Sequence, residues 1–158
     1  MLKALAQTLL IITLALLNST LANALSVDDI LKQKQPPPGI VFEIVSGDSS
    51  FLDKRLPSLR KDIKQLRERF PGLSIAIVSH GQEQFALTRE NSQNAKTAHS
   101  LVRQLVNESE VNVHVCETFA GWQGISAEDF PDYIDVSATG PAQINDYLEL
   151  DYELITLP

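Results

Sequence analysis

The chain is poor in cysteine, histidine and methionine, and each scarcity argues against a class of function. A single cysteine, Cys116, excludes an internal disulfide, so packing and contacts between subunits must stabilise the fold. The only methionine is Met1 and there are three histidines, which leaves few soft ligands for a metal. The sequence also lacks a glycine-rich phosphate loop, a nucleophile elbow and a paired-carboxylate signature. No cofactor is therefore predicted, and nothing indicates a hydrolase, kinase or dehydrogenase.

Basic residues are absent from the last third of the chain. Residues 104–158 contain 11 acidic residues and no Lys or Arg, whereas residues 25–103 contain 12 basic residues. Beyond residue 24 the net charge is −8, which argues against nucleic acid as a partner. Two interpretations of the segregated charge stay open. It is either a solvated acidic surface, or one half of a dipolar protomer whose acidic part meets a basic part of a neighbouring subunit.

The first residues have the layout of a secretory signal peptide. Lys3 precedes an apolar run from Leu9 to Leu17, and Ala22-Asn23-Ala24 forms a small-x-small cleavage site. We therefore expect residues 1–24 to be removed and the mature protein to reside in the periplasm. The alternative is an uncleaved amino-terminal anchor, although the apolar run is shorter than the roughly 20 residues of a membrane span. No later segment is apolar enough to cross a bilayer.

After cleavage, the sequence divides into a short tether and one domain. Residues 25–38 end in Pro36-Pro37-Pro38, which favours an extended polyproline segment. Residues 39–158 are long enough for one domain with a hydrophobic core.

Strand and helix patterns alternate along this domain. Such alternation predicts an α/β fold with three α/β/α layers and a mainly parallel sheet of about five strands. A helix with Leu59, Ile63 and Leu66 at helical spacing is expected to have Pro57 in its first turn. A capping box is predicted at Ser126–Asp129, and a helix that opens at Thr139-Gly140-Pro141 and runs to about Leu148. The expected strands are 40–46, 73–78, 111–115, 134–136 and 152–155.

The segment Val111–Ile125 is the strongest indication of a functional site. A β-branched strand delivers Cys116 to its carboxyl end, where ligands bind in open parallel sheets and where a following helix favours a thiolate. A lone cysteine is equally well explained as a small buried hydrophobe. Cys116 is the candidate nucleophile, and the candidate ligand-binding residues lie at this and other strand ends: Asp48, Ser79, His80, Glu117, Thr118 and Trp122.

These motifs resemble the DsrE/DsrF-like family, including its YchN-like members. The likeness rests on a first strand ending in Gly47-Asp48, a second ending in Ser79-His80-Gly81, and Val-x-Val-Cys-x-Thr with Gly124 eight residues after Cys116. It covers about residues 39–158. It implies a three-layer α/β/α fold, assembly into homotrimers or homohexamers, and a cysteine that carries sulfane sulfur as a persulfide. The chain departs from the relay members in having Gln123 where they commonly have Arg, and in placing Glu117 beside the thiol.

Three functional hypotheses follow. In the first, Cys116 attacks a sulfane donor, holds the sulfur and passes it to an acceptor protein, with His80 relaying a proton. At most this is a sulfur carrier or transferase. The alternative for His80 is a surface loop position.

In the second hypothesis, the protein is an oligomeric ligand-binding module without turnover, in which Trp122 and Phe119 wall a crevice. Such aromatic residues are otherwise core or interface.

The third hypothesis is a soft-metal site. His114 and Cys116 alternate onto one face of a strand, and His80 could join them. The competing interpretation is that His114 is buried or at an interface, and that His99 lies on a helix surface. No metal is predicted on balance.

Overall fold

The computed structural model describes residues 24–157. The predicted signal peptide, residues 1–24, lies outside the described residues except for Ala24. Within residues 24–157, none of the helices combines the length and the apolar character that crossing a bilayer requires.

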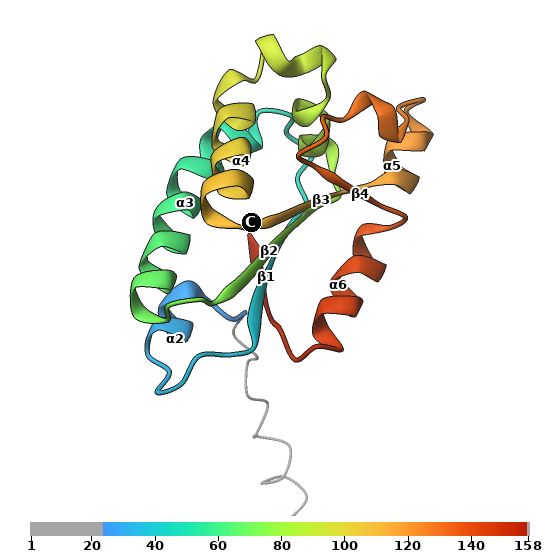
Figure 1. Cartoon of the computed structure of the whole chain (residues 1–158). Coiled ribbons are helices and arrows are strands. Elements are labelled where there is room, and N and C mark those ends of the chain that lie inside the picture. Colours follow the sequence, from blue (N-terminus) through green and yellow to red (C-terminus); the bar gives the residue numbers. More distant parts are fainter. Residues whose placement is uncertain (1–23, 158) are drawn as a thin grey trace, which may run out of the picture.

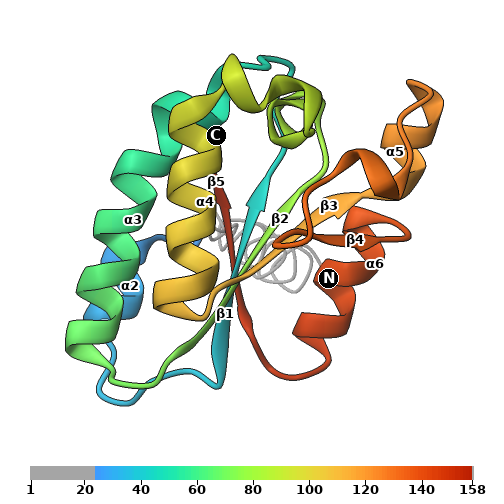
Figure 2. The same ribbon diagram turned by 45° about the horizontal axis from the view of Figure 1, so that its top comes forward.

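The predicted three-layer α/β/α fold is confirmed (Figure 1). Five strands form one sheet in the order β4-β3-β2-β1-β5, and every pair of neighbours is parallel. Helices α2, α3 and α4 cover one face, and α5 and α6 lie on the other (Figures 1 and 2). The strands are β1 (Gly39–Ile44), β2 (Ser74–Ser79), β3 (Asn112–Cys116), β4 (Asp135–Ser137) and β5 (Glu153–Leu157). The helices are α2 (Val27–Leu31), α3 (Phe51–Arg69), α4 (Lys96–Ser109), α5 (Glu117–Trp122) and α6 (Gly140–Leu148), with 3₁₀ helices at Gln82–Leu87, Glu90–Gln93 and Ala127–Asp129.

Strand alternation divides the core into two unequal parts. In β1, Ile40, Phe42 and Ile44 pack on the α3/α4 side in the larger cluster, whereas Val41 joins a smaller cluster on the α6 side. All four side chains are fully buried, as expected for a strand covered on both faces.

Helix α3 begins six residues earlier than the position of Pro57 suggests. The expectation that Pro57 lies in its first turn is wrong, because the helix starts at Phe51 and Pro57 lies inside it. Leu52 and Leu56 in the added turns are almost completely buried, so apolar packing outweighs the backbone hydrogen bond that a proline cannot make. The predicted capping box at Ser126 and the Pro141 start of α6 are both present.

Residues 25–38 pack onto the domain, in contrast to the loose tether that their prolines suggest. Ser26 caps helix α2 with a capping box, and Ile30 in that helix is fully buried in the main core. The Gln33 side chain donates to Glu153, and Arg69 donates to the Gln33 carbonyl oxygen at 3.0 Å. The polyproline segment is thus held between Gln33 on one side and the start of β1 at Gly39 on the other.

His99 lies in the interior, which corrects its predicted place on a helix surface. Its Nε2–H donates to the Ala86 carbonyl oxygen at 3.0 Å, so its Nδ1 accepts from the Tyr133 hydroxyl at 2.5 Å. His114 is buried, which agrees with the interpretation that competed with a metal-ligand role for this residue. Ser137 Oγ donates its proton to Gln143, so His114 Nδ1–H must be the donor in its hydrogen bond with Ser137 Oγ. His114 Nε2 then accepts from the Tyr147 hydroxyl. Both rings are therefore neutral.

Acidification is expected to weaken the fold as the pH falls below about 6.5. Burial lowers the pKa of His99 and of His114 below their ordinary value, so the unfolded chain takes up protons that the folded chain does not. Stability is therefore full above the unfolded value and is lost as the pH falls through it. Urea unfolding at about pH 7.5 and about pH 5.5 measures the loss. The variant H99Q/H114Q should show a flatter pH dependence, and an unchanged dependence would contradict the assignment.

Candidate functional site

Three side chains lie at the carboxyl ends of neighbouring strands, on the α6 side of the sheet. Ser79 of β2 pairs with Val115 of β3, so the next positions in register are His80 and Cys116. Alternation directs both side chains to the α6 side, opposite to Val115. Glu43 of the adjacent strand β1 lies on the same side, and its carboxylate oxygen is 3.0 Å from His80 Nε2.

Cys116 is almost enclosed, with 5 % of its surface exposed. Its Sγ accepts a hydrogen bond from the backbone N–H of Phe119 at 3.4 Å, which makes it the N-cap of the short helix α5. Gly124, at a φ of 73°, ends the turn that follows this helix. The backbone N–H of Phe119 therefore holds the thiol at the start of α5.

His80 is oriented by a carboxylate that is itself held in place. Glu43 Oε1 faces His80 Nε2, and Glu43 Oε2 accepts from the Thr156 hydroxyl at 2.9 Å. On its other side the His80 ring lies against Gly140, since a Cβ at Gly140 would lie 2.5 Å from the His80 Cβ. With Nε2 directed at the carboxylate, Nδ1 is the ring nitrogen that remains able to accept a proton.

Two further buried polar residues support this end of the sheet. Gln84 is fully buried, and its Oε1 accepts from the Cys116 N–H at 2.8 Å. This bond lies beyond the end of β2, which stops at Ser79. The Gln84 Nε2 has no hydrogen-bond partner among the described residues. Glu83 is also fully buried and accepts from Ser79 Oγ, from the Gly81 N–H and from the Ser46 N–H at 2.7–2.9 Å. Glu83 thus joins the loop after β1 to the loop after β2.

Two of the sequence-predicted ligand residues are already engaged elsewhere. Asp48 accepts from Lys54 and Ser50 at the start of α3, and the Lys54 ammonium with the Ser50 donors holds the pKa of its carboxyl well below its usual range. Ser79 faces the α3/α4 side and donates to Glu83, so it points away from Cys116. Both lie at the predicted end of the sheet, but neither shares a hydrogen bond with the His80–Cys116 pair.

The three candidates after Cys116 lie on or beside α5. Glu117 is exposed in its first turn, and Thr118 Oγ1 donates to the Ala138 carbonyl oxygen at 2.7 Å, which ties α5 to the loop before α6. Trp122 is 75 % exposed and packs edge-on against Phe119, which stacks on Phe85. Trp122 is therefore an exposed aromatic surface and does not wall an enclosed crevice.

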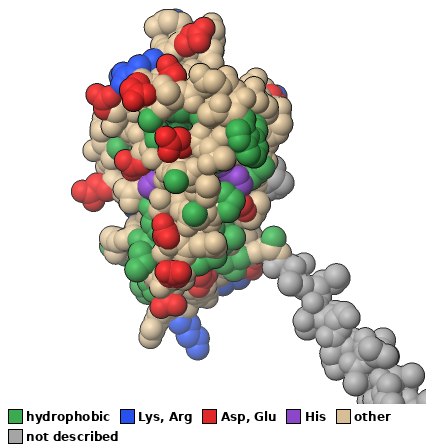
Figure 3. Space-filling model, turned by 90° about the vertical axis from the view of Figure 1, so that its right-hand side faces the viewer, with side chains coloured by type: hydrophobic (Ala, Val, Ile, Leu, Met, Phe, Trp, Pro, Cys, Tyr) green, Lys and Arg blue, Asp and Glu red, His purple; other side chains and the backbone are tan. Residues whose placement is uncertain are grey.

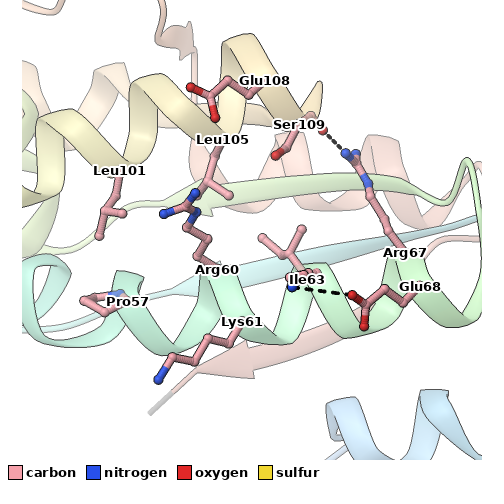
Figure 4. Close-up of a pocket in the computed structure, with 11 residues that line it drawn as sticks. Pro57, Arg60, Lys61, Ile63, Arg67, Glu68, Leu101, Leu105, Glu108 and Ser109 are labelled. Atoms are coloured by element: carbon pink, nitrogen blue, oxygen red, sulfur yellow. Dashed lines mark hydrogen bonds and ion pairs between the residues drawn. The ribbon is translucent and has the colours of Figure 1, made fainter.

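A groove of about 730 Å³ runs between α3 and α4, on the opposite side of the sheet from Cys116 (Figure 4). For the metal hypothesis, both ring nitrogens of His114 already have protein partners. Within residues 24–157, no group of three or more His, Cys, Asp or Glu side chains is arranged to hold a metal ion.

Sequence reasoning missed Glu43, Glu83 and Gln84. Glu43 carried a signal, because it is the one charged residue within an otherwise apolar strand, Gly39–Ile44. A charged side chain in such a strand requires a partner. Glu83 and Gln84 carried none, since a polar pair at the start of a short helix is ordinarily solvated.

Comparison with solved structures supports the fold. The chain is similar to MTH1491 from Methanobacterium thermoautotrophicum, a protein of unknown function (TM-score 0.58, 18 % identity, 75 % of this chain and 97 % of that one). It is also similar to BT1422 from Bacteroides thetaiotaomicron, a conserved protein of unknown function (TM-score 0.53, 14 % identity, 74 % and 94 %). The ychN protein of E. coli matches with a TM-score of 0.50, 20 % identity and 75 % and 99 % coverage. No protein-family model and no curated sequence matches. The fold is thus that of YchN-like proteins, which agrees with the DsrE-like resemblance.

Proposed function

We propose that this protein is an exported carrier that binds or transfers sulfane sulfur through Cys116. The observation that supports it is the row of three residues on adjacent strands, in which Glu43 orients His80 and His80 lies one strand away from Cys116. A nucleophile, a base and a group that orients the base form the arrangement of enzymes that activate a thiol or hydroxyl. Residues 1–24 would direct the chain to the periplasm.

The proposed step is a thiol exchange that needs no outside oxidant. The Cys116 thiol gives its proton to His80 Nδ1, and the thiolate attacks a sulfane sulfur of a polysulfide or of a partner's persulfide. The new S–S bond forms as the donor's S–S bond breaks, and the donor leaves as a shortened polysulfide or a thiolate. An acceptor thiolate then attacks the outer sulfur, and Cys116 leaves as a thiolate.

The buried amide of Gln84 provides additional support. Its Oε1 is occupied by the Cys116 N–H, which fixes the amide orientation and leaves Nε2 as an unused donor close to the cysteine. A buried donor without an acceptor costs about 1–3 kcal/mol, so a ligand atom that accepts from it would gain binding energy. An anionic sulfur chain attached to Cys116 is such an acceptor.

Intact mass after exposure to polysulfide tests the proposal. The wild-type chain is expected to gain one or more sulfur atoms and to lose them when an acceptor thiol is added. Cys116→Ser should gain none while it unfolds at a similar urea concentration. If the native protein gains no sulfur and Cys116 reacts with a thiol probe only after denaturation, the cysteine is structural. Retention of a polysulfide without covalent addition would instead favour a binding module without turnover.

A further inference from the structure

The groove between α3 and α4 has an apolar floor and a basic rim. Pro57, Ile63, Leu101 and Leu105 supply apolar surface. The cations around it are Arg60, Lys61, Lys64 and Arg67, against the two acids Glu68 and Glu108. In Figure 4, Arg60 reaches from α3 toward Leu105 of α4, across the groove.

The rim cations are mostly unneutralised. Lys64 has an exposed ion pair with Glu68 at 3.6 Å, but Arg60 and Lys61 make no ion pair within the described part of the chain. The Arg67 guanidinium donates to the Ser109 carbonyl oxygen, and its buried Nε has no partner among residues 24–157. A solvated surface of this kind favours an acidic occupant with apolar side chains.

A surface of the opposite character lies on the other side of the sheet. We call residues 146–151, at the end of α6, the acidic turn. Leu148 and Leu150 are 38 % and 62 % exposed, and they alternate with Asp146, Glu149 and Asp151, which are also exposed. Acidic side chains are spread across this side of the molecule, and basic ones appear only toward its edges (Figure 3).

We infer that the groove binds the acidic turn of a second copy of this chain. The two leucines would cover Leu101 and Pro57, while the carboxylates face Arg60, Lys61 and Lys64. The groove and the turn lie on opposite sides of the sheet (Figures 1 and 2), so one molecule cannot bring its own turn to its own groove. Each copy therefore has one groove and one turn to offer to other copies.

Mixing two variants tests this geometry directly. Light scattering on the full chain should give a mass above that of the monomer at high micromolar concentration. High salt should weaken the affinity between the copies about tenfold. The groove variant Lys61→Glu/Lys64→Glu and the turn variant Leu150→Glu should each be monomeric. An equimolar mixture should form a dimer and no larger species, because only the intact turn of the first fits the intact groove of the second.

A matched control carries the same charge change elsewhere. Lys34→Glu/Lys96→Glu reverses two exposed lysines outside the groove and should assemble as the wild type does. Circular dichroism of each variant reports whether it is folded. A monomeric wild type, equal loss of assembly in the control, or a mixture of folded variants that forms no dimer would each overturn the inference.

Discussion

Replacing Glu83 by alanine is expected to destabilise the domain by about 3–5 kcal/mol. The Glu83 carboxylate is fully buried and accepts three hydrogen bonds, from Ser79 Oγ and from the backbone N–H groups of Gly81 and Ser46. Alanine would leave these donors buried without an acceptor, and each orphaned donor costs about 1–3 kcal/mol. Partial access of water to the vacated space limits the total.

Urea unfolding measures this loss, and a neighbouring glutamate supplies the control. Glu90 is exposed in the next 3₁₀ helix, so Glu90→Ala should change stability by less than about 0.5 kcal/mol. Glu83→Gln should fall between the two, because its amide oxygen can replace one carboxylate oxygen while its NH₂ group faces a donor. A loss below about 1 kcal/mol for Glu83→Ala would show that the three bonds do not hold the loops together.

Replacing His80 by alanine is expected to slow the reaction of native Cys116 with polysulfide about 10²-fold. His80 follows β2 at the position in register with Cys116, and Glu43 holds its Nε2. Without the ring, the thiol proton must pass to water, which is a weaker base. Glu43→Gln should have a smaller effect, about tenfold, because a neutral amide still accepts from Nε2–H but stabilises the protonated ring less.

The pH profile separates this role from a structural one. In His80→Ala the rate should rise with the hydroxide concentration alone, because no side chain replaces the ring as a base. The rates of this variant and of the wild type should therefore converge at high pH. Asp48→Asn is the control, since Asp48 lies at the same end of the sheet but binds Lys54 and Ser50. Equal rates in the wild type and His80→Ala would remove the histidine from the proposed step.

The sequence by itself determined the elements and the layers of this protein. Period-2 and period-3.6 patterns are local, so strands, helices and the parallel three-layer arrangement could be predicted. The capping box at Ser126 and the start of α6 at Thr139-Gly140-Pro141 could be predicted in the same way. The position of Cys116 at a strand end followed from the same local pattern.

Only the tertiary structure decided which strand ends meet. The order β4-β3-β2-β1-β5 places β1, β2 and β3 side by side. This brings Glu43 to His80 and puts His80 and Cys116 at the ends of adjacent strands. Strand order depends on contacts between residues far apart in the chain, which no local pattern encodes. The burial of Ile30 and His99 has the same origin, because each is covered by segments distant in sequence. Asp48 and Ser79 looked equivalent to His80 as polar residues at strand ends. Their hydrogen-bond partners, and for Ser79 also the side of the sheet that it faces, distinguish them from His80.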